Sequence, residues 1–263
     1  MHMSQLRYNP LRGIWVEILQ SSSLPTLLPM EKTGIHQKEE LSPFASVEGL
    51  FRLQCEQLFM ESIPCPEGLS AQVLVQAAQR DNTICFLYQR GADLLLMGNT
   101  QIDTVASEEL KRQSEYYKRK GSLLLHDYAM NEMGQGKRIV AENEQFLAVV
   151  PYWSESAYEI LILPRFEKMH TLLDIDELLL ASLIRKTEAL YDKLCGSPCG
   201  YMLALYQSPQ QSSSFHIHIV PSIKKNMQFC QGYEILVRHC VSITAEQAAL
   251  FLQEGKNGNN HSN

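Results

Sequence analysis

Hydrophobic residues recur at helical spacing most clearly between residues 174 and 196. The leucines of this stretch fall on one stripe of a helix, which is typical of a helix that packs on a core. They are Leu179, Leu183, Leu190 and Leu194. Asp174 with Glu177 three residues later predicts an N-cap and its capping-box partner, and Gly196 predicts the C-terminal end. The pattern therefore predicts a helix that begins after Asp174 and ends at Gly196.

Short apolar runs bounded by turn residues predict strands on both sides of this helix. The predicted strands cover residues 83–88, 94–103, 138–142, 146–151, 158–163, 201–206 and 214–220. Further helices are predicted at residues 69–80, 107–119 and 122–132. The order helix, strand, loop, strand occurs twice, which suggests an internal duplication. Residues 20–48 mix serine, proline and charged residues without a period, so we expect a loop there.

The composition is that of a folded domain with a core. Of the 263 residues, 45% are hydrophobic and 20% are charged, which excludes an intrinsically disordered chain. No apolar stretch reaches the length of about 18 residues that a membrane-spanning helix needs, so we expect no membrane insertion. The 23 basic and 29 acidic residues give a net charge of −6, which argues against a nucleic-acid partner. The net charge does not exclude a small anionic ligand, because a few local donors are enough to bind one.

The cysteines and the N-terminal residues favour the cytoplasm. The seven cysteines are an odd number, and the opening MHMSQLRYNP lacks the basic segment and apolar run of a signal peptide. We therefore expect reduced thiols. Cys195 and Cys199 are spaced like one half of a zinc site, but the second short ligand pair is lacking, which favours buried or loop thiols.

The predicted strand at 214–220 carries the strongest chemical signal. Side chains alternate along a strand, so His216 and His218 share one face, about 7 Å apart, while Phe215, Ile217 and Ile219 face the core. Two imidazoles directed at one place can hold a metal ion or attack a phosphate. On alternation alone, a polar outer face of an antiparallel sheet is the favoured alternative.

Several segments together resemble the galactose-1-phosphate uridylyltransferase family, a branch of the histidine-triad superfamily. They are RYNPLRGIWV (7–16), ENEQFLAVVPYWSESAYEILILPR (142–165), FHIHIVP (215–221), QGYEIL (231–236) and ITAEQAALFL (243–252). The resemblance implies an α+β fold of two fused half-barrel repeats with an antiparallel sheet and flanking helices. We expect the first, shortened repeat at residues 1–135 and the second at residues 136–263.

The resemblance also implies one metal site in the second repeat. Glu142, His216 and His218 match the family's metal ligands, and the position of the fourth ligand is Tyr206. These ligands suit zinc or iron, with water or the Tyr206 phenol in the fourth place. For Glu142, the alternative is a strand residue that faces solvent.

The first repeat departs further from the family. Asn99 stands where the family has its nucleophilic histidine, and a carboxamide nitrogen neither attacks phosphorus nor carries protons near neutral pH. Gln228 stands where the family has a phosphate-binding lysine. Gln101, Tyr233 and Glu234 match substrate-binding positions, although a strand face, a sheet edge and solvent are the respective alternatives.

Three hypotheses of function follow from the residues and the resemblance. The first is a uridylyltransferase-like protein of galactose metabolism that binds a nucleotide sugar or sugar phosphate but is catalytically impaired. The second is a histidine-triad-type nucleotide hydrolase or phosphorylase that uses His216 as the nucleophile. The third is a non-catalytic dimer partner of an active relative. We expect a cytoplasmic homodimer, and metal content separates the first hypothesis from the second.

Overall fold

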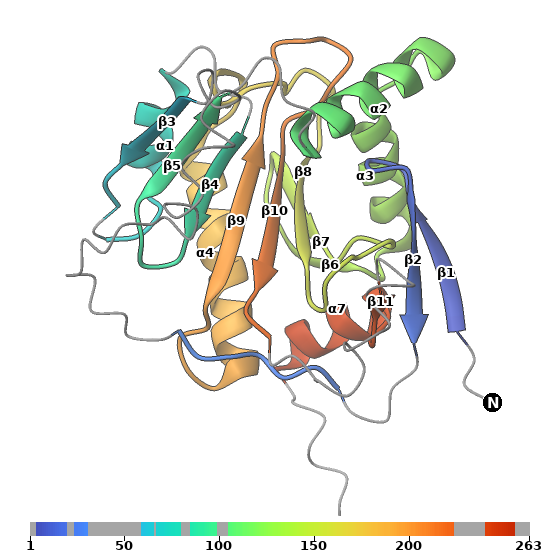
Figure 1. The fold of residues 1–263 in the computed structure, drawn as a ribbon, viewed down its shortest axis with the longest axis vertical. Coiled ribbons are helices and arrows are strands. Elements are labelled where there is room, and N and C mark those ends of the chain that lie inside the picture. The colour runs from blue at the N-terminus through green and yellow to red at the C-terminus, as the bar shows by residue number, and fades with distance from the viewer. Residues whose placement is uncertain are drawn as a thin grey trace, which may run out of the picture.

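The computed structural model describes residues 4–19, 24–30, 59–65, 67–79, 85–98, 105–223 and 240–255. Its centre is an eight-stranded sheet with the strand order β3-β5-β4-β9-β10-β8-β7-β6, and the pairs along it are antiparallel (Figure 1). Its strands are β3 (Phe59–Ile63), β4 (Cys85–Gln89), β5 (Leu94–Gly98), β6 (Ile139–Glu142), β7 (Phe146–Val149), β8 (Ile160–Pro164), β9 (Tyr201–Tyr206) and β10 (His216–Pro221).

A smaller sheet and five α-helices complete the described fold. The small sheet has the order β1-β2-β11 and lies beside the large one (Figure 1). Its strands are β1 (Ser4–Asn9), β2 (Ile14–Leu19) and β11 (Cys240–Val241). The helices are α1 (Ala71–Ala78), α2 (Val105–Lys120), α3 (Leu124–Gln135), α4 (Glu177–Cys195) and α7 (Ala245–Glu254). The predicted α+β class with an antiparallel sheet and flanking helices is confirmed.

The helices cover both faces of the large sheet where its strands are continuously apolar. On one face, α1 and α4 contribute to the main core together with Phe146 and Ile160. On the other face, α3 packs against Leu147 and Leu161. Strands β7 and β8 are therefore buried on both sides, which explains why their sequences FLAV and ILILP do not alternate.

Strands β9 and β10 keep the alternation that the sequence shows. In β9, Leu203 and Leu205 lie in the core, whereas Met202 on the opposite face is 46% exposed. In β10, Ile217 and Ile219 are buried in the same core. The opposite face of β10 carries His216, His218 and, near the end of the strand, Val220.

The start of α4 differs from the sequence prediction by two residues. Asp176 is the N-cap, because its side chain accepts hydrogen bonds from the backbone N–H groups of Leu178 and Leu179 at 2.9 and 3.1 Å. Asp174 instead closes a capping box with Thr171 around a separate 3₁₀ turn, Leu172–Asp174. Asp174 and Asp176 both precede the helix. Asp174 belongs to the 3₁₀ turn, and Asp176 caps α4.

Strands from both predicted repeats join in the one large sheet, where β4 pairs with β9. The division into repeats at residues 1–135 and 136–263 stays a prediction. Within the loop expected at residues 20–48, the described part is 24–30, which forms single bridges through Leu27 and Pro29. The remainder of that loop lies outside the described residues. Among the helices that the structure describes, none combines the length and the apolar character needed to cross a membrane.

Candidate metal centre

Strand β10 places two imidazoles side by side on the face opposite the core. His216 pairs with Tyr206 across the β9–β10 ladder, and His218 pairs with Ala204. The two imidazole centroids lie 5.4 Å apart at an interplanar angle of 74°. His216 and His218 therefore lie on one face of β10, as the alternation in the sequence predicts. His216 is 1% exposed, so it is not part of a solvated outer face.

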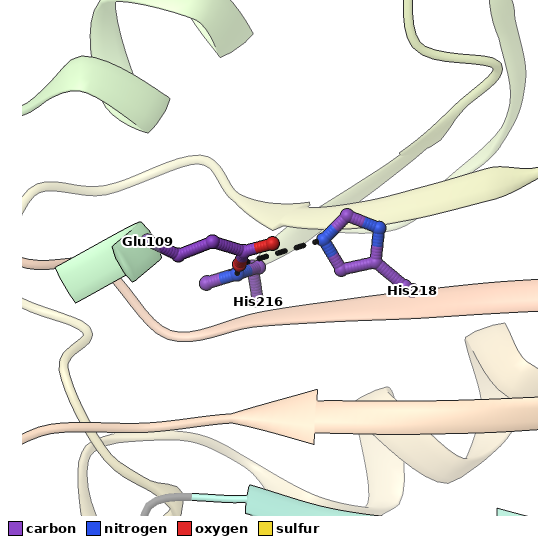
Figure 2. Close-up of side chains that lie close together, drawn as sticks. All are labelled: Glu109, His216 and His218. Atoms are coloured by element: carbon purple, nitrogen blue, oxygen red, sulfur yellow. Dashed lines mark hydrogen bonds and ion pairs between the residues drawn. The ribbon is translucent and has the colours of Figure 1, made fainter. Parts of the chain in front are cut away.

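A buried carboxylate from α2 reaches both histidines (Figure 2). Glu109 is 2% exposed, and Ala106 and Gln113 are the other buried residues of this helix. These three positions are three and four residues apart and so lie on one helix face. Glu109 Oε2 lies 2.9 Å from His216 Nε2 and 3.8 Å from His218 Nε2. Helix α2 thus directs an acidic side chain at the histidine face of β10.

The hydrogen bonds at the far side of each ring determine which nitrogen faces Glu109. His216 Nδ1 lies 3.0 Å from the Ser214 carbonyl oxygen, which can only accept, so Nδ1 carries a hydrogen. His218 Nδ1 lies 2.9 Å from Glu159 Oε1 and carries a hydrogen for the same reason. His218 Nε2 is buried and has no hydrogen-bond partner among the described residues. Both Nε2 atoms face the Glu109 carboxylate, and a metal ion bound there would replace the hydrogen bond between His216 Nε2 and Glu109.

The electrostatics favour a charged carboxylate between the rings. Burial alone would raise the pKa of Glu109, but the hydrogen bond from His216 and the charges of His218 and His216 outweigh it and hold that pKa below its usual value. Burial lowers the pKa of His218, whereas the hydrogen bond to Glu159 and the charge of Glu109 raise it by more, so it lies above its usual value. Both pKa shifts have the same cause, the attraction between the carboxylates and the imidazoles beside them.

The three side chains fit a metal ion in ligand type and in spacing. Their ligand atoms all lie within 4.8 Å of one another, and theirs is the group with this spacing in the described part of the chain. Three ligands bound at about 2 Å to one zinc ion lie about 3–4 Å apart, so a small movement would bring them into place. In the neutral His218 ring with its hydrogen on Nδ1, the Nε2 atom has no hydrogen-bond partner among the residues that the structure describes and carries a lone pair that can bind a metal. Each imidazole also has the carbonyl or carboxylate behind it that metal-binding histidines usually have.

Tyr206 lies against the histidine pair, as its position in the resemblance implies. Its ring stacks on His216 with centroids 5.0 Å apart and 10° between the planes, and it meets His218 edge-on at 5.6 Å. The ring forms one wall of the group and fixes the plane of the His216 imidazole.

The structure does not bring Glu142 to the histidines. Glu142 ends β6, and strands β8 and β7 lie between β6 and β10. Its side chain is 55% exposed and lies 3.6 Å from Arg165, so it matches the solvent-facing alternative. Glu109, rather than Glu142, is the carboxylate that lies beside the two histidines. The one signal in the sequence was an acidic residue on the helix face shared with Ala106 and Gln113, which is hard to distinguish from a solvated face.

The other predicted site residues cannot be placed. Asn99, Gln101, Tyr233 and Glu234 lie outside the described residues. Their roles in catalysis and substrate binding stay predictions.

Residues 109–263 match the family model described as galactose-1-phosphate uridyl transferase, C-terminal domain. The chain belongs to this family. The matched region contains Glu109, His216 and His218, so the whole candidate metal centre lies inside the part that is shared with the galactose-1-phosphate uridyl transferases.

Curated relatives match more than half of the chain. The galactose-1-phosphate uridylyltransferase of Schizosaccharomyces pombe is 33% identical over an alignment of 166 residues, and the match covers 58% of this chain and 45% of that protein. The Haemophilus influenzae enzyme of the same name is 29% identical over an alignment of 164 residues, and the match covers 59% of this chain and 47% of that protein. The matched part of the chain thus spans less than half the length of these relatives.

Solved structures share the fold over nearly the whole chain. A galactose-1-phosphate uridylyltransferase-like protein from Arabidopsis thaliana superposes with a TM-score of 0.65 at 18% identity, covering 96% of this chain and 99% of that one. An ADP-glucose phosphorylase from the same plant, with ADP-glucose bound, also gives 0.65, at 16% identity. At these identities the likeness concerns the fold.

Proposed function

We propose that this protein is a uridylyltransferase-like, nucleotide-sugar-binding member of the family that holds one zinc or iron ion and is impaired in uridylyl transfer. The observation that carries the metal proposal is the convergence of Glu109, His216 and His218, with the unpartnered His218 Nε2 among them. When bound, the ion would supply a link between α2 and β10. The ion is proposed as a structural one, because Glu109 and His216 are buried and the His218 side chain is only 14% exposed.

Asn99 carries the proposal of catalytic impairment. The resemblance places the nucleophile of a double displacement at this position, and an amide nitrogen cannot form the uridylyl intermediate. Substrate binding is a separate matter, because Gln101, Tyr233 and Glu234 match family positions. We therefore propose that a nucleotide sugar or a sugar phosphate binds without the transfer that the relatives' name describes.

The test is a mass measurement of the intact protein after incubation with UDP-glucose. We expect no covalent uridylyl adduct and no exchange between UDP-glucose and galactose 1-phosphate above background. The Haemophilus influenzae relative, treated in the same way, is the positive control. An acid-labile uridylyl group on any residue of this chain would contradict the proposal, and its position would identify the nucleophile.

The alternative of a hydrolase or phosphorylase that uses His216 is less well supported. A nucleophilic imidazole needs a nitrogen that substrate can reach, but His216 is 1% exposed. Its Nδ1 faces the Ser214 carbonyl and its Nε2 faces Glu109. Hydrolysis or phosphorolysis of UDP-glucose or ADP-glucose that is lost in His216→Ala would favour this alternative.

A homodimer and a cytoplasmic location complete the proposal. Light scattering during gel filtration measures the mass of the particle and so tests the homodimer. Mixing with an active relative before gel filtration tests the third hypothesis, that the protein is a non-catalytic dimer partner. Fractionation of cells that express the chain tests its location.

A further inference from the structure

Glu159 divides its two carboxylate oxygens between the metal centre and the backbone. Oε1 lies 2.9 Å from His218 Nδ1. Oε2 accepts from the backbone N–H groups of Glu155 at 2.8 Å and Ser156 at 3.4 Å, and from the Ser154 hydroxyl at 3.5 Å. Glu159 is 6% exposed. One side of the carboxylate is thus anchored by three donors while the other side is presented to the histidine.

The chain segment before Glu159 is held in an unusual conformation. Tyr158 has φ of 61°, and it is the non-glycine residue with positive φ in the described part of the chain. The left-handed region is unfavourable for a residue with a side chain. The surroundings oppose relaxation, because the Tyr158 ring is buried and its carbonyl accepts from the Tyr191 hydroxyl at 2.8 Å. Backbone strain of this kind clusters at functional sites.

We infer that Glu159 is a positioning residue that prepares His218 to bind a metal ion. A neutral imidazole carries one hydrogen, and the Glu159 carboxylate can only accept, so it draws that hydrogen to Nδ1. Nε2 is then left with its lone pair, on the side where Glu109 and His216 lie. The inference rests on the proposed metal site, and it adds the residue that selects which ring nitrogen is available there.

Glu159→Gln separates this role from simple support of the fold. Gln fills the same space, but its amide has one acceptor and one donor end. The three donors that face Oε2 hold the amide oxygen on their side, so the NH₂ group faces His218 Nδ1. That nitrogen must then accept, and the hydrogen moves to Nε2, where it blocks a metal. Loss of such a partner typically costs about 10- to 100-fold in metal affinity.

The experiment compares unmutated protein, Glu159→Gln and the matched control Glu142→Gln by zinc titration and by nitrogen NMR of the imidazole side chains. We expect zinc affinity to fall about 10- to 100-fold in Glu159→Gln and to be unchanged in Glu142→Gln. In metal-free protein, at a pH where His218 is neutral, we expect the hydrogen on Nδ1 in the unmutated chain and on Nε2 in Glu159→Gln.

Each outcome decides one of the two claims. Full zinc affinity in Glu159→Gln, or the same His218 tautomer in both proteins, would overturn the role of Glu159. If unmutated protein binds neither zinc nor iron, the metal proposal fails, while the NMR comparison still tests Glu159. If Glu159→Gln does not fold, the tautomer in the unmutated chain decides, because a hydrogen on Nε2 there would contradict the inference directly.

Discussion

At the scale of single residues, the surroundings of each carboxylate determine what it can do. Glu109 is buried between two imidazoles, and Glu132 is fully buried beside Arg138. Glu142 is more than half exposed and contacts Arg165 from 3.6 Å. A buried carboxylate needs a partner because the interior solvates charge poorly, whereas an exposed one does not. The two buried glutamates therefore depend on particular neighbours, and Glu142 does not.

Replacing Arg138 with methionine should destabilise the protein strongly. Arg138 Nε lies 3.0 Å from Glu132 Oε1, and its Nη1 lies 2.7 Å from Glu246 Oε1. Removal of one partner of a buried pair costs about 3–5 kcal/mol, because the remaining charge is uncompensated. The free energy of unfolding, measured by urea denaturation, should fall by about that amount in Arg138→Met.

The matched control for this prediction is Lys111→Met. Lys111 is 66% exposed and pairs with Glu108 from 4.0 Å, so its loss should cost less than about 1 kcal/mol. Equal and small losses in both variants would show that the Arg138 cluster does not have the buried character described above.

At the scale of helices and strands, the hydrophobic pattern predicts most of the elements around the site. The alternation in FHIHIVP is sufficient to place His216 and His218 on one face, because it depends only on local geometry. Glu109 could not be found in this way, since its role depends on how α2 packs across β10. The choice between Asp174 and Asp176 as the cap of α4 also depends on a 3₁₀ turn that periodicity does not detect.

The two candidate caps of α4 can be distinguished by substitution. Asp176→Ala removes the acceptor for the N–H groups of Leu178 and Leu179 and should lower the free energy of unfolding by about 1 kcal/mol. Amide hydrogen exchange at these two leucines should become faster. In Asp174→Ala their exchange should stay at the unmutated rate, and faster exchange there instead would restore the cap expected from sequence.

At the scale of the whole molecule, the candidate centre connects parts that are far apart in sequence. Glu109 belongs to α2, in the first expected repeat, whereas His216 and His218 belong to β10, in the second. The sheet connects the same two parts through the pairing of β4 with β9. An ion at the centre would therefore stabilise a long-range contact, and its removal would lower the free energy of unfolding of the whole protein.

The most direct test of this account is the metal content of the purified protein and of two variants, with melting temperatures measured before and after chelation. We predict about one equivalent of zinc or iron and a melting temperature that falls on chelation, because an ion bound only by the folded state adds to its stability. Glu109→Gln should lose the metal and Glu142→Gln should keep it. Metal-free unmutated protein whose melting is unaffected by added zinc or iron, or loss of metal in Glu142→Gln with retention in Glu109→Gln, would contradict the account.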